Sequence, residues 1–300
     1  MTRQLNLLAL LAPLALAGCC GLRGSLPPRV HPLDPEAPIQ VIPVAPGAAW
    51  IPPAVGERWV YAATWNGIPV GTAVLEATDL RMVRGRKALH MACTVQLSAY
   101  IRAFYHLQDE VATDIDVETG LPLQFTKHIE EGKRLKDEFI AFDHAGKVAT
   151  YYRQETGEGE TSFTPLLAMD IPDGVQDPLS SLFRARALKL LDGQEETIQV
   201  NTDEKTYATR LKALGRERLT LEAFGTVSAI RIDPSLDYEG VLPSKGRMQL
   251  WVEEETRIPL KMVLEIKIGS VSAELIGREG AAAPFKPAPP EAAPIPPSKP

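Results

Sequence analysis

ERWVYAATWNGIPV, residues 57–70, is the stretch of sequence that decides the fold. Side chains alternate along it with the period of a β-strand, so that Trp59, Tyr61 and Trp65 lie on one face. Asn66-Gly67 then ends the alternation, and both residues tolerate the positive φ of a two-residue hairpin turn. The segment therefore predicts a strand, a tight turn and an antiparallel return strand.

Short runs of the same kind continue along the chain, separated by turn residues such as Glu118-Thr119-Gly120. Such a series predicts an antiparallel meander that is curved or closed, because raw strand edges are then avoided. The expected fold class is mainly β: a large curved antiparallel sheet or barrel, a half-barrel-like meander with two short helices. The expected strands are Glu57–Asn66, Val70–Thr78, Lys87–Leu97, Asp109–Val117, Pro122–Glu130, Leu135–Phe142, Val148–Arg153, Glu196–Asn201, Tyr207–Leu214, Glu217–Glu222, Thr226–Ile232, Gly246–Glu253, Pro259–Ile268 and Val271–Gly277.

Two helices are expected to interrupt the meander. Ser98 precedes Ala99–Tyr105 and is placed to cap that helix at its N-terminus. The second helix has a stronger start signal, because Asp177 is a good N-cap and Pro178 suits the first helical position. Apolar residues then repeat at helical spacing to about Leu190.

Prolines divide the 300-residue chain, because many of the 26 gather before residue 56 and after residue 280. Proline fixes φ and donates no backbone hydrogen bond, so these ends are not expected to hold a helix or a central strand. The expected organisation is a signal peptide at 1–18, a lipidated cysteine with a proline-rich tether at 19–55, a β-rich domain at 56–279 and a disordered Ala/Pro tail at 280–300.

Composition excludes several classes of protein. Hydrophobic residues make up 45% of the chain and charged residues 23%, which excludes a disordered chain and a multispan membrane protein. The formal net charge is −6. Because an acidic protein repels phosphate backbones, nucleic acid is not an expected partner.

The N-terminus has the form of an export signal. Arg3 is followed by the apolar run Leu7–Leu16, which is too short to span a bilayer. The run ends in Leu16-Ala17-Gly18-Cys19, which resembles the lipobox of bacterial lipoproteins, whose cysteine receives a diacylglyceryl group. An ordinary secretory signal with a chance cysteine is the alternative. The residue after Cys19 is Cys20 and not aspartate, which by resemblance to Gram-negative lipoproteins favours the periplasmic face of the outer membrane.

Several short motifs occur together in a recognisable order: Gly56-Glu57-Arg58-Trp59-Val60-Tyr61, Trp65-Asn66-Gly67-Ile68-Pro69-Val70-Gly71, Asp177-Pro178-Leu179-Ser180, Trp251, Arg257-Ile258-Pro259 and Ile268-Gly269-Ser270. Over most of Gly56–Gly277 the chain therefore resembles a family of bacterial exported proteins known as domain of unknown function 3108. This resemblance implies an envelope β-domain and no assigned activity. The arrangement is also similar to the half-barrel of lipoprotein carrier and receptor proteins, in which a curved sheet wraps an apolar cavity covered by helices.

Familiar catalytic motifs are missing from the sequence, which has no Gly-x-Ser-x-Gly, His-Glu-x-x-His, Walker or Gly-x-Gly-x-x-Gly pattern. His128 and Glu130 share a strand face and could bind a metal ion or shuttle a proton, or they could form a cross-strand or solvent pair. Asp177 with Ser180 would suit a hydrolase, but the cap explains Asp177 fully. No catalytic residue, metal or cofactor is therefore expected.

A second acidic set, Asp114, Asp116 and Glu118, also alternates onto one strand face. Carboxylates placed in this way could gather a calcium ion, and a solvated strand face is the other interpretation.

An aromatic helix is the main candidate for ligand binding. Tyr100, Ile101, Phe104 and Tyr105 share one face of it. They could line the mouth of a cavity for an acyl chain or another apolar ligand, or they could plug the end of the sheet as ordinary core.

Three functions are compatible with these features of the sequence. The first is an outer-membrane-anchored lipoprotein whose non-enzymatic β-domain binds an apolar envelope ligand or a partner protein. The second is a structural accessory subunit of an envelope assembly, and an envelope hydrolase ranks third. A cavity inside the sheet would favour the first, a filled sheet the second.

Cys19→Ala should abolish incorporation of labelled palmitate and release the protein from the membrane. The lipid on Cys19 is the expected anchor, since several buried acyl chains hold a protein at about 0.8 kcal/mol per CH₂. Cys20→Ala is the matched control and should keep both label and location. Continued labelling of Cys19→Ala would contradict the lipobox interpretation.

Overall fold

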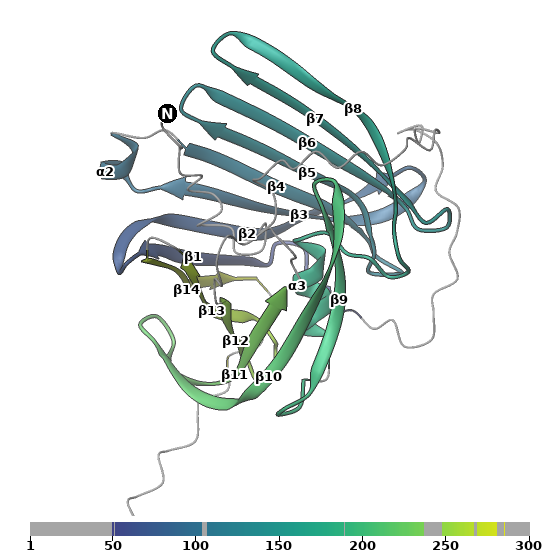
Figure 1. Cartoon of the computed structure of the whole chain (residues 1–300). Coiled ribbons are helices and arrows are strands. Elements are labelled where there is room, and N and C mark those ends of the chain that lie inside the picture. The colour runs from purple at the N-terminus through teal and green to yellow at the C-terminus, as the bar shows by residue number, and fades with distance from the viewer. Residues whose placement is uncertain are drawn as a thin grey trace, which may run out of the picture.

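The computed structural model describes residues 50, 52–103, 107–188, 190–236, 248–266, 269–280 and 285. These residues form one antiparallel sheet of 14 strands that curves around a short helix, α3 (Figure 1). The predicted fold class, a curved half-barrel-like meander, is confirmed. The strands are β1 (Arg58–Trp65), β2 (Ile68–Val83), β3 (Arg86–Leu97), β4 (Leu107–Asp116), β5 (Pro122–Glu131), β6 (Arg134–Asp143), β7 (Val148–Gly157), β8 (Glu160–Asp170), β9 (Glu195–Thr202), β10 (Lys205–Leu221), β11 (Gly225–Leu236), β12 (Met248–Glu253), β13 (Pro259–Ile266) and β14 (Gly269–Glu279).

The sheet is open, and its two edges lie in the middle of the sequence. Its strand order is β8-β7-β6-β5-β4-β3-β2-β1-β14-β13-β12-β11-β10-β9. The first strand therefore pairs with the last, with Arg58 opposite Glu279 and Trp65 opposite Val271. The edges are β8 and β9, and the chain between them carries α3 (Ser180–Arg186).

The hairpin predicted at Asn66-Gly67 is confirmed. The two residues have φ of 50° and 79°, as the mirror-image turn between β1 and β2 requires. The Asn66 side chain has a further role, because its Oδ1 accepts a hydrogen bond of 2.8 Å from the amide of Ser270 in β14. The turn that starts the fold is thus tied to the last strand.

Two strands differ from the sequence-based prediction. The strand β8 was not predicted, because most of its side chains are exposed on both faces and Pro165 interrupts it. The strand β10 was predicted as two strands that meet near Gly215. It is continuous, because Gly215 (φ 139°) lies at a bulge within the β10–β11 ladder and does not end the strand.

The helix α3 is shorter than predicted, because it ends at Arg186 and not near Leu190, and its N-cap position is Leu179. Asp177 nevertheless makes the predicted side-chain hydrogen bonds at the start of the helix. Its Oδ1 accepts the backbone N–H groups of Leu179 and Ser180 at 2.7 and 2.9 Å. Its Oδ2 accepts the hydroxyl of Thr113 on β4 at 2.5 Å. The same carboxylate therefore caps the helix and holds it on the sheet.

The largest apolar cluster fills the concave side beneath α3. Phe183 of α3 is fully buried, and its ring centroid lies 5.7 Å from that of Trp59 on β1. The Arg186 guanidinium lies 5.2 Å from the Trp59 ring centroid and adds a cation–π contact. Buried residues from β1 to β7 and from β10 to β14 contribute to this cluster, so the helix occupies the middle of the half-barrel.

The first helix of the described chain, α2 (Ala99–Arg102), is shorter than predicted. Ser98 does occupy the N-cap position, but its hydroxyl makes no capping hydrogen bond and has no partner. The predicted cap at Ser98 is therefore wrong. No helix within the described residues has the length and apolar character needed to cross a membrane.

Single residues from the two predicted flanks contact the domain. Trp50 packs against the main apolar cluster, and its ring lies so close to the α-carbon of Gly120 that a Cβ there would clash with it. Phe285 lies 5.1 Å from the ring of Phe224, and Arg278 stacks on it at 4.5 Å. The packed body therefore includes these two aromatic side chains, whereas 1–49 and 286–300 lie outside the described residues.

Phe183→Ala should lower the free energy of unfolding by about 3–5 kcal/mol, because it removes a fully buried ring from the centre of the concave side. Leu191→Ala, at an exposed position, is the control and should change it by less than about 0.5 kcal/mol. Urea unfolding followed by tryptophan fluorescence measures both. Equal small losses would show that α3 covers empty space.

Candidate functional site

The residues predicted to bind a ligand are only partly described. Tyr100 on α2 is 50% exposed, and Ile101 packs against a small apolar cluster that includes Leu97 and Leu107. Phe104, Tyr105 and the lipidation residue Cys19 lie outside the described residues. The ligand cavity expected at the aromatic helix stays a prediction.

His128 forms the cross-strand pair that was one of its two interpretations. Its Nδ1 lies 2.6 Å from Asp137 on β6, and its Nε2 lies 3.5 Å from Glu130 on its own strand. Asp137, and to a lesser degree Glu130, raise the pKa of His128. Across the described parts of the chain, no three metal-ligating side chains come together in a group that could hold a metal ion.

The acidic set on β4 does not gather at one point. Asp114 lies 2.8 Å from His90 and accepts a hydrogen bond of 2.7 Å from Gln124, whereas Asp116 pairs with Arg86. Both carboxylates are buried, so the expected solvated face is wrong for them. They lie on the face of β4 opposite to Val111, Thr113 and Ile115, and His90, Gln124 and Arg86 bind them there.

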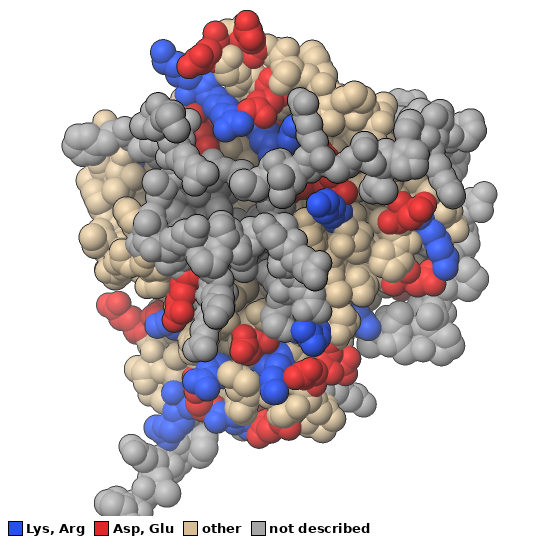
Figure 2. All heavy atoms as spheres, in the orientation of Figure 1, with Lys and Arg blue, Asp and Glu red and all other residues tan. Residues whose placement is uncertain are grey.

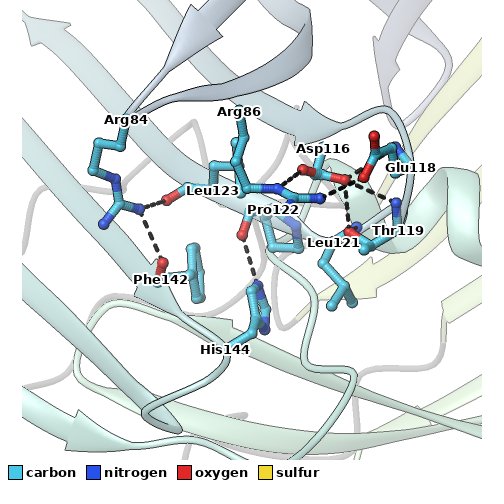
Figure 3. A network of polar contacts seen from close by, with 10 residues as sticks. All are labelled: Arg84, Arg86, Asp116, Glu118, Thr119, Leu121, Pro122, Leu123, Phe142 and His144. Atoms are coloured by element: carbon cyan, nitrogen blue, oxygen red, sulfur yellow. Dashed lines mark hydrogen bonds and ion pairs between the residues drawn. The ribbon is translucent and has the colours of Figure 1, made fainter. Parts of the chain in front are cut away.

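Asp116 belongs to a polar network that joins three turns at one end of the sheet (Figure 3). It accepts the N–H and hydroxyl of Thr119 at 2.8 and 3.0 Å, and Arg86 also reaches Glu118 at 3.0 Å. Arg84 donates to the carbonyl oxygens of Leu123 and Phe142. These bonds use backbone acceptors and turn amides, which makes the network structural.

A buried lysine–carboxylate cluster lies on the concave side of β5 and β6. Lys127 Nζ is 3.0 Å from Glu138 and 3.3 Å from Asp203, which lies in the β9–β10 turn. The Tyr151 hydroxyl donates a hydrogen bond of 2.9 Å to Glu138, and Lys136 Nζ lies 2.5 Å from the Glu138 carboxylate. The cluster ties the turn of one edge hairpin to the opposite half of the sheet.

This cluster was not predicted from the sequence, although a signal exists. Lys127 continues the inward register of Leu123 and Phe125, and Glu138 begins that of Ile140 and Phe142. A charge in an apolar register indicates a buried ion pair, but its partner Asp203 is far away in sequence.

Electrostatics favour the charged forms of Lys127 and Glu138, whereas burial raises the pKa of Asp203 to about 6. Burial opposes both charges, yet Asp203 and Glu138 raise the pKa of Lys127, and Lys127 with Lys136 lowers the pKa of Glu138. Neither group therefore titrates near neutral pH, which suits a structural tie and not proton transfer.

Asp109 is the main buried acid without a side-chain partner. It is 2% exposed, and neither carboxylate oxygen accepts a well-aligned hydrogen bond. Burial, and then the charge of Glu131, raises the pKa of Asp109 to about 8, against smaller effects of the Glu130 backbone, Lys127 and His128. Both effects favour the protonated form of Asp109 in the folded protein.

A narrow cleft remains between α3 and the strands β11 to β13. Arg186 and Arg257 line it together with apolar side chains. It leaves about 10 Å³ of room, which is about enough for one water molecule. This cleft cannot hold an acyl chain.

The two sheet edges are finished differently. Along β9, the amide of Gln176 donates to the carbonyl of Gln199 at 2.8 Å, and its carbonyl accepts the Asn201 amide at 2.7 Å. Along β8, no described residue pairs with the side facing away from β7. Phe163 and Leu166 are 61% and 58% exposed there. We use the name β8 edge for the strand Glu160–Asp170 together with its backbone groups that face away from β7. The β8 edge is the candidate interaction site.

Asp109→Asn should raise the melting temperature at pH 8 and change it little near pH 4. The folded protein keeps Asp109 protonated up to about pH 8, whereas the unfolded chain ionises it above about pH 4. Between these pH values the free energy of unfolding of the wild-type protein falls by up to about 1.4 kcal/mol per pH unit because of Asp109. An asparagine at this position does not ionise, so the variant does not show this fall.

Thermal melts of both proteins across this range measure the difference. Asp173→Asn, at an exposed position, is the control and should show no such trend. A difference in melting temperature between wild type and Asp109→Asn that does not change with pH would contradict the buried, unpartnered state of Asp109.

Three solved structures share the outline of this chain at low similarity. A β-barrel-like protein of domain of unknown function DUF1849 from Brucella abortus has 11% identity and a TM-score of 0.47, covering 75% of this chain and 97% of its own. A protein from Bacteroides fragilis with a YmcC-like fold, provisionally described as exported, has 8% identity and a TM-score of 0.32, covering 77% and 99%. A provisionally described lipoprotein from Parabacteroides distasonis has 8% identity and a TM-score of 0.31, covering 75% and 96%. These values support no functional conclusion.

The comparison with sequence families gives a clear result. A search of curated proteins found no significant match. The profile of one family, described as "Protein of unknown function (DUF3108)", matches residues 60–276, which run from β1 to β14. The match reaches all 14 strands and confirms the resemblance carried by the β1–β2 hairpin, the Asp177 cap and Trp251. The chain belongs to the DUF3108 family.

Proposed function

We propose that the protein is a lipoprotein, anchored through Cys19 at the periplasmic face of the outer membrane, whose β-domain binds a partner protein of an envelope assembly and catalyses no reaction. The lipobox Leu16-Ala17-Gly18-Cys19 supports the anchor, and Cys20 supports the outer membrane. The predicted tether at 19–55 would let the domain reach partners away from the membrane surface.

The observation that carries this proposal is the packing of α3 inside the curved sheet. A half-barrel carrier needs a cavity of several hundred Å³ on its concave side to bury most of a ligand. Here Phe183, Leu179 and Leu182 of the helix segment occupy the middle of that side and are buried against the sheet. The adjoining cleft leaves room for about one water molecule. The packing of the described residues beneath α3 favours contacts made on the outside of the sheet.

The state of the polar side chains supports a binding role over catalysis. The Ser180 hydroxyl accepts the Asp177 amide at 2.9 Å, and the Asp177 carboxylate holds two amides and Thr113. Lys127 is held between two carboxylates. Each of these groups is engaged by its neighbours, whereas a general base must be available to the substrate.

Native mass spectrometry of the lipidated protein, extracted gently from its own membrane, tests the proposal. A binding module should appear with a second protein subunit and with no lipid mass beyond its own acyl chains. A retained lipid that survives Cys19→Ala would instead identify a carrier and overturn the proposal.

Binding of a fluorescent fatty acid by the purified protein gives an independent test. The packed interior predicts no saturable binding, and Phe183→Ala, which opens space beneath α3, should gain it. Saturable binding by wild type that Tyr100→Lys weakens would locate a ligand at α2 and favour the carrier hypothesis. Met82→Lys, at another exposed apolar position, is the control.

A further inference from the structure

We propose that the β8 edge pairs with an extended segment of the partner protein, and that this segment carries apolar residues at alternate positions and Lys or Arg at both ends. The inference rests on the proposed function in one respect, namely that a partner protein exists. It adds where the partner binds and which chemistry the edge recognises.

Backbone groups supply the first part of the argument. An edge strand presents unpaired N–H and C=O groups, which can accept one more strand. The edge at β9 is partly occupied by Gln176, which bonds to Gln199 and Asn201. Within the described parts of the chain, β8 pairs only with β7. The eleven residues of β8 are therefore the longer open template.

Side chains on β8 supply the second part. Proteins usually protect an edge strand with lysine or another charge in its centre. The sequence ETSFTPLLAMD has no basic residue, and its centre holds the exposed side chains of Phe163 and Leu166. Phe163 also contacts the ring of Tyr152 on β7, with centroids 6.5 Å apart. The edge thus offers a small apolar surface that a partner strand would cover.

Charge at the ends of β8 supplies the third part and defines the occupant. Glu160 and Asp170 are the terminal residues of the strand, and neither has an ion pair with a described residue. Figure 2 shows acidic side chains at the top of the molecule, where the β7–β8 hairpin ends, beside basic ones. Opposite charges across a strand pair are favourable, and like charges are unfavourable. Basic residues at the ends of the partner strand therefore fit.

The same charges disfavour a second copy of this chain. Antiparallel pairing of β8 with itself about Pro165 places Glu160 opposite Asp170 at both ends. Pro165 also lacks an N–H and lies at the bulge between Tyr151 and Arg153. The missing N–H of Pro165 limits non-specific strand pairing and restricts the register. A partner strand of complementary sequence can still pair with the residues of β8 before and after Pro165.

Fluorescence anisotropy with labelled synthetic peptides tests the proposal on the full mature chain. The probe KTVTVTVTVK has alternating apolar residues and basic ends, and ETVTVTVTVE is its matched acidic counterpart. We expect the lysine-ended peptide to bind at least about tenfold more tightly, which corresponds to about 1.4 kcal/mol. Equal affinities, or no binding of either peptide, would overturn the charge argument and the proposal with it.

Two variants locate the binding. Leu166→Lys places a positive charge in the centre of β8, where it opposes strand pairing. It should lower the affinity for the lysine-ended peptide by about tenfold or more. Ile68→Lys is the matched control, because Ile68 is also 58% exposed but begins β2, and it should leave binding unchanged. Equal effects of both substitutions would mean that the peptide binds elsewhere.

A third peptide tests the pairing itself. N-methylation of alternate residues of KTVTVTVTVK removes the N–H groups on one edge and should abolish binding, because strand addition depends on backbone hydrogen bonds. Undiminished binding of this peptide would overturn strand pairing, and it decides the matter alone if Leu166→Lys does not fold. Failure here leaves the mass-spectrometric test of a bound subunit intact, so the two proposals fail separately.

Discussion

The pairing of β1 with β14 is the interaction on which the rest of the structure depends. It joins the two ends of the domain at the centre of the sheet, with Trp59 opposite Arg278 and Trp65 opposite Val271. Without it the chain would form two separate meanders, β1–β8 and β9–β14, each with an edge beside the chain ends. Because this contact closes a loop of about two hundred residues, its entropic cost must be met by many later contacts, and such topologies fold slowly. The same pairing transfers both open edges to the middle of the sequence, at β8 and β9.

Two polar ties then connect distant parts of the curved sheet. Asp177 connects α3 to Thr113 on β4, and Lys127 connects β5 to Asp203 in the β9–β10 turn. Both ties are buried, so each charge or hydroxyl would be costly without its partner. The two polar ties lie beside the apolar cluster around Trp59 and Phe183, whose burial provides the hydrophobic attraction between these parts of the sheet. The ties therefore fix a geometry, and the apolar core stabilises it.

Sequence alone predicted the parts of this structure that depend on nearby residues. The hairpin at Asn66-Gly67 and the cap at Asp177 involve contacts within a few positions, and the alternation along β1 reports its own buried face. The failures share a different cause. Strand β8 has little alternation because few of its side chains are buried, so only its neighbour β7 reveals it. The cluster at Lys127 depends on a residue in a distant turn. The hydroxyl of Ser98 matched a capping preference, but the short α2 that follows does not use it.

An exposed apolar edge strand is a liability in a protein, because it can pair with other chains. The sheet has one such edge at β8. Pro165 removes one N–H donor from it and Glu160 and Asp170 lie at its ends, but its centre keeps the exposed side chains of Phe163 and Leu166. At β9 the equivalent groups are satisfied internally by Gln176. Where α3 and its apolar neighbours occupy the concave side, recognition by the described residues would use the outer faces and edges of the sheet. If the protein binds a partner, the open β8 edge is therefore the feature that this function would preserve, because the β9 edge is already partly paired.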